Sequence, residues 1–541
     1  MRTERLIKAL PTLLILAVSL LGVGLMAYAT RWGPTVYSDG VVYLLSADSF
    51  AKGDGLGITW GSGRFHALDG FPPLYSLVVA LLETMGLSMM SAARLLSVAG
   101  FGALIGAAGL LGMRATRSVG VGLSVCLLLV TSPLLLVQFA NAGSEGVFYL
   151  TGLSGLILLL VAEESGRRGV WALAAVLLGL AFLSRYVGVS LILTASLFTA
   201  FAAGWPSRGR LWKGVRVAAI AIGMMLPWLL WTHSTSGTLG GKTPHVLGDL
   251  WAESEPLRAG LIDITWKWLP LLGGLQASYR VRGIVLLVAL LSLIGILIAS
   301  FAAARRRPGE LTGVVPLARW GAILLLWGVL YALVHAVAFL TAYPTPDVSL
   351  RILTPLYLSG AMAALGVAWL VPKVSRPRSP LVALPLVALL LLVIPNGRQS
   401  MQLANSLNRE GAGFTNRTWQ TSELIAAVRQ LPEGTPIITN APDAIIFLTG
   451  RPTYWIPEIM RGQESPDSST FGDHPERSEE ERAFRDRHGV LVFAPGIESQ
   501  LQTIYRERTR DRLESMTHGL RVLWWNGPDQ AIYSYPEIGG P

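Results

Sequence analysis

Two carboxylates and two arginines lie at the ends of apolar segments. Side chains of these types can take up a proton and bind a phosphate group. Asp39 follows the first apolar run, and Glu145 lies in the turn between two later runs. Arg185 interrupts a long apolar stretch, and Arg351 begins another. A carboxylate can take the proton of an attacking hydroxyl, and an arginine fork can bind two phosphate oxygens. The functional interpretation of these residues is therefore catalysis by a carboxylate and phosphate binding by the arginines.

Each of these residues also has a purely structural interpretation. Asp39 could be a solvated loop carboxylate or the N-cap of the next helix, and Glu145 could simply favour a helix N-terminus. Arg351 could pair with Asp347, one helical turn away. The sequence leaves these alternatives open for each residue alone, but all four together favour a common site if they share one side of a membrane.

The composition is typical of a polytopic membrane protein. Of 541 residues, 52% are hydrophobic and 14% are charged, against about 25% charged residues in soluble domains. The net charge of +10 comes from short Lys/Arg clusters between apolar runs, as in membrane proteins. These features exclude a soluble enzyme, a disordered chain and a nucleic-acid-binding scaffold. The single cysteine, Cys126, excludes an intramolecular disulfide and a Cys-based metal site.

Eleven apolar runs are predicted to be transmembrane helices, each of which needs about 20 residues to cross a bilayer. The runs cover roughly 9–29, 92–113, 117–137, 144–163, 170–183, 187–203, 213–233, 282–303, 316–340, 350–371 and 379–395. Arg185 and Tyr186 divide the stretch 170–203, because it is too long for one helix. Pro72–Met85 is shorter and begins with two prolines, so we expect an interfacial or re-entrant helix there.

The positions of the Lys/Arg clusters predict the orientation. With eleven spans the clusters share one side, which the positive-inside rule makes the cytoplasm. The N-terminus is then inside, and the outer side holds the loops 30–91 and 234–281 together with the tail. We therefore predict a polytopic α-helical membrane domain over 1–395 and an extracytoplasmic domain over 396–541.

The tail has ordinary polar composition and is predicted to be a small α/β domain. Ser422 is expected to cap a helix that runs to Gln430. The strands are expected at 437–439, at 490–494 and, as a hairpin, at 520–525 with 531–535. The charged stretch 463–488 is expected to be a loop.

Several short motifs, in this order, resemble the GT-C membrane glycosyltransferases. They are Asp39 in a long outer loop, Phe71-Pro72-Pro73-Leu74-Tyr75, Ala93-Arg94-Leu95-Leu96, Ser144-Glu145-Gly146-Val147-Phe148, Phe182 to Gly188, Arg351 to Tyr357, and the tail stretch Ile438 to Asp443 with Thr449-Gly450-Arg451-Pro452. The pattern is most similar to the bacterial branch that contains protein O-mannosyltransferase and lipid A aminoarabinose transferase.

The resemblance implies an inverting enzyme that moves a hexosyl or pentosyl group from a polyprenyl-phosphate donor to an acceptor hydroxyl on the outer face of a bacterial cytoplasmic membrane. It implies Asp39 as general base and Glu145 as a second acidic position. Arg185 and Arg351 match positions on the same face, and their phosphate contact is our inference, with Lys52 and Arg64 as further phosphate ligands. Candidate substrate-binding residues are Tyr43, His66, Asp69, Tyr75, Lys242 and Arg280.

Other functions remain as alternatives. A polymer ligase with a lipid-diphosphate donor is close to the first interpretation. A flippase or transporter would require midplane charges and a two-fold repeat, of which we find neither, and a non-catalytic assembly or receptor protein would not require Asp39. The acceptor could be a glycan, a lipid or a protein. Related oligosaccharyltransferases use a metal, but the first outer loop has no DxD triplet, so we expect none.

Overall fold

The computed structural model describes residues 2–201, 207–241, 243–244, 254–268, 276–306, 313–343, 346, 348–374, 379–457 and 478–535. The chain forms two compact units. The helical unit comprises residues 1–34 and 69–409, and the tail unit comprises 35–68 and 410–541.

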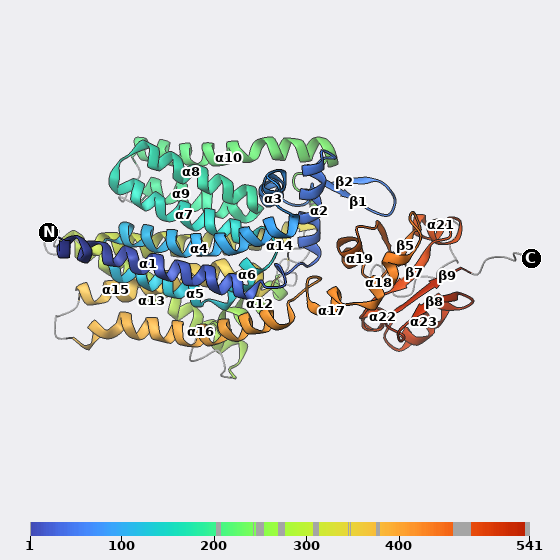
Figure 1. Ribbon diagram of the computed structural model, residues 1–541. Helices are drawn as coiled ribbons and strands as arrows, with labels where there is room; N and C mark the ends of the chain where they lie inside the picture. Colours follow the sequence, from blue (N-terminus) through green and yellow to red (C-terminus); the bar gives the residue numbers. More distant parts are fainter. Residues whose placement is uncertain are drawn as a thin grey trace, which may run out of the picture. The chain divides into compact units, whose positions relative to one another are not determined.

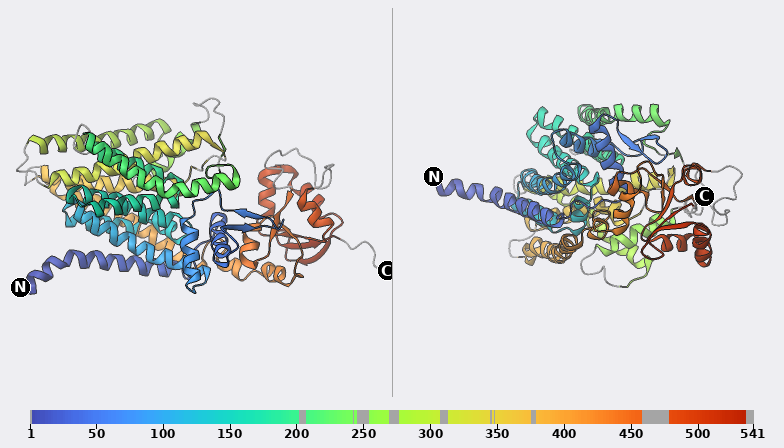
Figure 2. Two further views of the ribbon diagram at one scale, coloured as in Figure 1. Left: turned by 90° about the horizontal axis from the view of Figure 1, so that it is seen from above. Right: turned by 45° about the vertical axis from the view of Figure 1, so that its right-hand side comes forward.

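The helical unit is a bundle of long helices that run alongside one another in Figure 1 and in the left view of Figure 2. Its helices are α1 (Arg2–Ala29), α3 (Leu74–Thr84), α4 (Met89–Thr116), α5 (Val119–Thr131), α6 (Pro133–Ala140), α7 (Glu145–Ser165), α8 (Arg168–Ser184), η1 (Tyr186–Gly188), α9 (Val189–Phe201), α10 (Arg208–Ser236), α12 (Glu255–Lys267), α13 (Tyr279–Arg306), α14 (Val314–Thr341), α15 (Leu350–Val374), η2 (Pro380–Ala383) and α16 (Leu384–Glu410). Two short strands, β3 (Thr243–Pro244) and β4 (Ala342–Tyr343), pair in antiparallel fashion.

Each of the eleven predicted apolar runs is helical. Among the described residues, eight helices are long and apolar enough to cross a membrane, and α5 with α6 makes a ninth candidate that is bent by 61°. Arg185 separates the shorter helices α8 and α9, as predicted. Large apolar side chains are exposed along α13, including Ile284, Leu287 and Leu291. The protein is an integral membrane protein.

Glycines allow close packing between α1, α4 and α5. A Cβ at Gly109 would lie 2.1 Å from Cys126 Sγ, and a Cβ at Gly102 would lie 2.3 Å from Val23 Cγ2. Small residues let membrane helices approach and gain dispersion contacts that the lipid chains do not offer. Cys126 is fully buried at this contact, so its role in the structure is packing.

A proline breaks the span formed by α5 and α6. Ser132 accepts a hydrogen bond from Leu135 N as the N-cap of α6, and Pro133 occupies the first helical position. Proline cannot continue α5, because it lacks an N–H and clashes with the preceding turn. α6 therefore takes a new direction, and it ends at Ala140 just before the turn that leads to α7.

The tail unit combines a segment of the first predicted loop with the C-terminal part of the chain. Its elements are α2 (Ser38–Lys52), β1 (Gly57–Thr59), β2 (Phe65–Ala67), α17 (Arg417–Gln420), α18 (Glu423–Gln430), β5 (Ile437–Thr439), α19 (Pro442–Thr449), β6 (Thr453–Trp455), α21 (Glu479–Arg485), β7 (Val490–Phe493), α22 (Ile497–Tyr505), η3 (Arg506–Arg508), α23 (Thr509–Thr517), β8 (Arg521–Trp525) and β9 (Ala531–Ser534). β5, β6 and β7 are parallel, and β9 joins β7 and β8 in antiparallel fashion, in the order β6-β5-β7-β9-β8.

Alternating side chains of the central strand β7 fill two cores. Val490 and Val492 pack in one cluster with residues of α18 and α19, such as Leu424 and Ile445. Leu491 and Phe493 pack in a second cluster with residues of α21, α22 and α23. Successive residues of a strand point to opposite faces, so helices cover both sides of the sheet. The predicted strands, hairpin and Ser422-capped helix are confirmed.

One part of the predicted tail is wrong. The stretch 463–488 was expected to be a loop, but residues 479–485 form α21. Ser478 and Glu481 make a capping box at its N-terminus, and Ala483 and Phe484 are buried. Reciprocal capping and two well-placed apolar side chains stabilise this short helix in spite of its charge. Residues 463–477 lie outside the described residues.

The structure divides the chain differently from a cut at residue 395. α16 continues as one helix to Glu410, and residues 35–68 fold with the tail. Val36 forms a parallel bridge with Gly413, and Gly61 N donates to Thr453 O at 3.1 Å. Because these contacts join backbone groups far apart in sequence, the local pattern did not predict them.

The bridge between Val36 and Gly413 can be tested by substitution. Gly413 has φ +60, and a Cβ there would lie 2.1 Å from Val36 O. Gly434 has φ +79 with nothing near its Cβ position, so Gly434→Ala has the left-handed strain without the clash. We expect Gly413→Ala to lower the melting temperature of the full chain in detergent by several degrees more than Gly434→Ala, since about 1 kcal/mol corresponds to a few degrees. Equal shifts would show that the bridge does not form.

Candidate functional site

The carboxylate of Glu145 is bound by two arginines of the helical unit. Arg185 NH1 lies 2.5 Å from Glu145 Oε1, and Arg351 NH1 lies 3.6 Å from the same oxygen. The Glu145 side chain is 7% exposed, against 22% for Arg185 and 40% for Arg351. Arg351 thus approaches Glu145, and the alternative partner Asp347 lies outside the described residues. We call Glu145, Arg185 and Arg351 the arginine–carboxylate cluster.

Local backbone features bring this cluster together. Arg185 is extended (φ −149, ψ 134) between α8 and η1, so the helix stops and its side chain can turn toward α7. Gly188 permits the tight turn, because a Cβ there would lie 2.6 Å from Phe182 Cα. A Cβ at Gly143 would lie 2.6 Å from Glu145 Oε2. Glycine at both positions leaves room for the carboxylate and its partner.

Gln138 of α6 connects the cluster to a small hollow. Its Nε2 donates to Arg351 O at 3.1 Å and to Thr354 Oγ1 at 3.4 Å. The residue is 2% exposed, and among the described residues no donor lies within hydrogen-bonding distance of its Oε1. The bend at Pro133 is what turns this polar residue toward α15.

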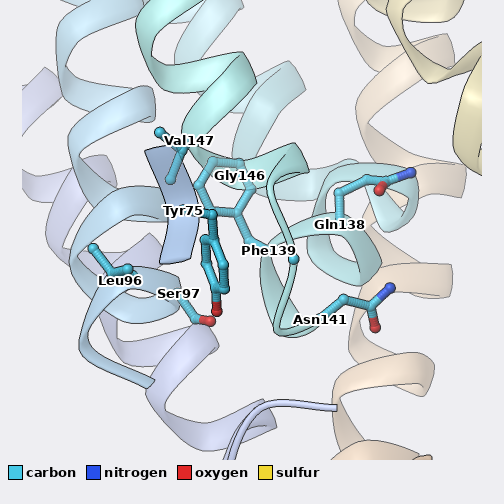
Figure 3. A pocket seen from close by; sticks show the side chains of 9 residues that line it. Tyr75, Leu96, Ser97, Gln138, Phe139, Asn141, Gly146 and Val147 are labelled. Carbon is cyan, nitrogen blue, oxygen red and sulfur yellow. The ribbon is translucent and has the colours of Figure 1, made fainter. Parts of the chain in front are cut away.

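The hollow next to Gln138 is small, with room for about one water molecule. In Figure 3 the Tyr75 ring from α3 lies among the lining residues, while the amide groups of Gln138 from α6 and Asn141 from the following turn point away from this ring. Ser97 and Gly146 also line it. A space of this size is too small for a sugar and can take only a water molecule or a single small group.

Asp39 belongs to the tail unit and lies in the first turn of α2. α2 packs against α19, whose first turn carries Asp443. The Ser38 side chain lies near the Asp443 carboxyl. Burial raises the pKa of Asp443, the nearby Asp39 carboxylate raises it further, and the Ser38 hydroxyl opposes both. The tail unit therefore holds two neighbouring carboxylates.

The tail motif that includes Asp443 otherwise has structural roles. Asn440 Nδ2 donates to Ala494 O, and Ala494 N donates to Asn440 Oδ1, which joins the ends of β5 and β7. Arg451 NH1 donates to Val428 O and Leu431 O at 2.9 Å each, which satisfies carbonyls at the end of α18. Asp443 makes no comparable sheet or helix-end contact.

The remaining predicted residues are dispersed over the two units. In the tail unit, Lys52 pairs with Asp48 at 2.5 Å, Tyr43 is buried in α2, and Arg64 and His66 are exposed on or beside β2. In the helical unit, Asp69 O accepts a hydrogen bond from Tyr186 Oη at 3.5 Å, Tyr75 lines the hollow, and Arg280 is exposed in the first turn of α13. Lys242 lies outside the described residues.

No group of three or more His, Cys, Asp or Glu residues among the described residues is arranged to hold a metal ion. Asp39 and Asp443 supply two carboxylates, and both arginines of the arginine–carboxylate cluster repel a cation.

Two residues next to the candidate residues, one in each unit, were not predicted from the sequence. Gln138 follows the third apolar run directly, and a polar residue there is a weak signal for function. Asp443 ends the tail motif that begins at Ile438, but its position near Ser38 and Asp39 depends on the packing of α2 against α19.

Comparisons with known proteins were made by sequence and by structure. No protein-family model matches the chain, and no curated protein gives a significant sequence match. The solved structure of ArnT from Cupriavidus metallidurans in the apo state is 14% identical, with a TM-score of 0.54, over 98% of both chains. The same protein bound to undecaprenyl phosphate gives 15% identity and a TM-score of 0.50, over 98% of this chain and 99% of that chain.

A third similar structure is the oligosaccharyltransferase of Archaeoglobus fulgidus in complex with Zn and sulfate. It is 13% identical, with a TM-score of 0.55, over 96% of this chain and 74% of that chain. At such identities the likeness is one of fold. The chain is therefore an integral membrane protein with the fold of the GT-C glycosyltransferases, as its sequence motifs predicted.

Proposed function

We propose that this protein transfers a hexosyl or pentosyl group from a polyprenyl-phosphate donor to an acceptor hydroxyl on the outer face of a bacterial cytoplasmic membrane. The arginine–carboxylate cluster within a GT-C fold carries the proposal. ArnT, which is similar over nearly its whole length, has been solved with undecaprenyl phosphate bound. The acceptor is a glycan, a lipid or a protein, the N-terminus is cytoplasmic, and the tail is extracytoplasmic.

The charge of the cluster supports phosphate binding. Two guanidinium groups and one carboxylate leave a net charge of +1, and the Arg351 side chain is 40% exposed. Arginine presents several N–H donors in a planar fork, so Arg185 and Arg351 can bind Glu145 and still donate to phosphate oxygens. Glu145 orients both arginines toward the donor.

The reaction is a single displacement with inversion. The Asp39 carboxylate accepts the proton of the acceptor hydroxyl as its oxygen attacks the anomeric carbon. The bond between that carbon and the phosphate oxygen breaks, and the oxygen keeps the electron pair. The arginines stabilise the negative charge that develops on the leaving lipid phosphate. One base is sufficient, because a retaining reaction would require a separate nucleophile.

The role of Asp39 is tested with Asp39→Asn. We expect loss of transfer by about 100-fold or more, since asparagine cannot take the proton, while donor binding persists. The measurement is transfer from a panel of radiolabelled polyprenyl-phosphate sugars by membranes of equal protein content. Asp54→Asn, at an exposed carboxylate just after the same helix, is the control and should keep full activity. Full turnover by Asp39→Asn would refute the assignment of the base.

The role of Arg351 is tested with Arg351→Ala. Glu145 keeps Arg185 as a partner at 2.5 Å, so the fold should persist. We expect kcat/KM for the donor to fall by about 100-fold, and Arg351→Lys to lie between the alanine variant and wild type, because it keeps the charge but loses the fork. Arg31→Ala is the control, at an exposed arginine 5.7 Å from the Trp32 ring. An unchanged kcat/KM in Arg351→Ala would remove this arginine from the site.

Donor competition distinguishes this function from its alternatives. A polyprenyl-monophosphate sugar should be consumed, and a lipid-diphosphate sugar should compete poorly. Preferential use of the diphosphate would favour a polymer ligase. Movement of donor across sealed vesicles without glycosyl transfer would favour a flippase.

A further inference from the structure

We propose that Gln138 of α6 is a positioning residue for Arg351. Its side-chain amide replaces a backbone donor that Pro355 lacks, and so fixes the turn of α15 from which Arg351 reaches Glu145. The role rests on the proposed function, since it takes Arg351 as a ligand of the donor phosphate. It brings the bent pair α5 and α6 into the donor site.

Pro355 cannot give the carbonyl of Arg351 the hydrogen bond that a helix normally provides. The backbone ladder of α15 begins where Leu353 N donates to Ser349 O at 3.0 Å. In the same pattern Arg351 O would accept from residue 355. That residue is a proline inside the helix, which has no N–H and whose ring crowds the carbonyl four residues before it. The carbonyl therefore favours a donor from outside α15.

Gln138 supplies this donor. Its Nε2 lies 3.1 Å from Arg351 O and 3.4 Å from Thr354 Oγ1. A carbonyl oxygen can only accept a hydrogen bond, so the nitrogen of the amide, and not its oxygen, faces Arg351. Gln138 is 2% exposed and Thr354 is fully buried. Water therefore does not compete for this hydrogen bond.

The bend between α5 and α6 gives Gln138 its direction. The two helices meet at 61°, because Pro133 ends α5 and starts α6. In Figure 3 the Gln138 side chain leaves α6 away from the Tyr75 ring. One proline thus directs an amide to α15, and a second proline, Pro355, provides the carbonyl that it binds.

A second side chain holds the same turn but has a different role. Tyr331 of α14 donates from its Oη to Ile352 O at 2.5 Å. Residue 356 is a leucine and has an N–H for the same carbonyl. Tyr331 therefore supplements a helical hydrogen bond, whereas Gln138 replaces a missing one. Loss of the Gln138 amide is the change that the helix cannot compensate.

The position of the Arg351 backbone matters for its side chain. The guanidinium lies 3.6 Å from Glu145 Oε1 and its side chain is 40% exposed, whereas Arg185 lies 2.5 Å from the same oxygen and is 22% exposed. The ion pair alone thus holds Arg351 less closely than it holds Arg185. Fixing its backbone carbonyl limits the positions from which the guanidinium can bind a phosphate oxygen.

Lipid binding tests the role of the amide. The measurement is the Kd of the full chain in detergent for undecaprenyl phosphate. In Gln138→Met, which keeps the length of the side chain but loses the donor, we expect Kd to rise about tenfold. Asn396→Leu is the matched control, because Asn396 Nδ2 also donates to α15, at Tyr357 Oη and 2.5 Å, and should leave Kd unchanged. An unchanged Kd in Gln138→Met would overturn the proposal.

A double-mutant cycle with Pro355→Ala separates positioning from packing. Alanine at 355 restores a backbone N–H for Arg351 O, so Gln138→Met should raise Kd by less than about threefold in the Pro355→Ala background. If Gln138 only packed α6 against α15, its substitution would have the same effect in both backgrounds, and this result would overturn the proposal. The same cycle measured on melting temperature applies if Gln138→Met alone is too unstable to bind lipid.

The variant Arg351→Ala separates this inference from the proposed function. If Arg351→Ala leaves the Kd for undecaprenyl phosphate unchanged, the phosphate ligand is wrong and the positioning role is overturned with it. If Arg351→Ala weakens binding and Gln138→Met does not, the positioning role alone is overturned. Weaker binding in both, with rescue by Pro355→Ala, is the expected result.

Discussion

The contact of Glu145 with Arg185 and Arg351 is the interaction on which the candidate phosphate site of the helical unit depends. A nearly buried carboxylate is costly unless it is paired and hydrogen-bonded, and here its partners come from the break between α8 and α9 and from the start of α15. Gly143 and Gly188 leave room for this arrangement, since a Cβ at either position would clash. Removing one arginine leaves the carboxylate a second partner, whereas removing Glu145 would leave two positive charges close together.

Buried ion pairs add little to stability in general, because desolvation opposes the Coulomb attraction. The desolvation cost of such an ion pair has a reason if the pair also binds a charged ligand. The arginine–carboxylate cluster keeps one net positive charge next to a hollow lined by Tyr75, Gln138 and Asn141. In the proposed reaction this charge meets a lipid phosphate, and the carboxylate serves mainly to hold the two guanidinium groups in place.

The proposed general base belongs to a different compact unit from the arginines. Asp39 folds with the tail, through the bridge of Val36 to Gly413 and the packing of α2 on α19. When the chain is divided by hydrophobicity alone, the tail is a separate domain that follows the membrane part. In the structure, however, the tail unit includes α2, the helix that carries Asp39, and α2 packs against α19 of the tail.

The sequence by itself determined the membrane class, the helical runs, the break at Arg185 and most strands of the tail, because each depends on local hydrophobic period, capping or charge. It also identified Asp39, Glu145, Arg185 and Arg351 by residue type and position in order along the chain. Only the tertiary structure decided that Glu145 binds both arginines, that Gln138 faces α15, that residues 479–485 are helical, and that Asp39 and Asp443 are neighbours. These contacts join residues separated by tens to hundreds of positions, and such pairings depend on side-chain packing that no local pattern encodes.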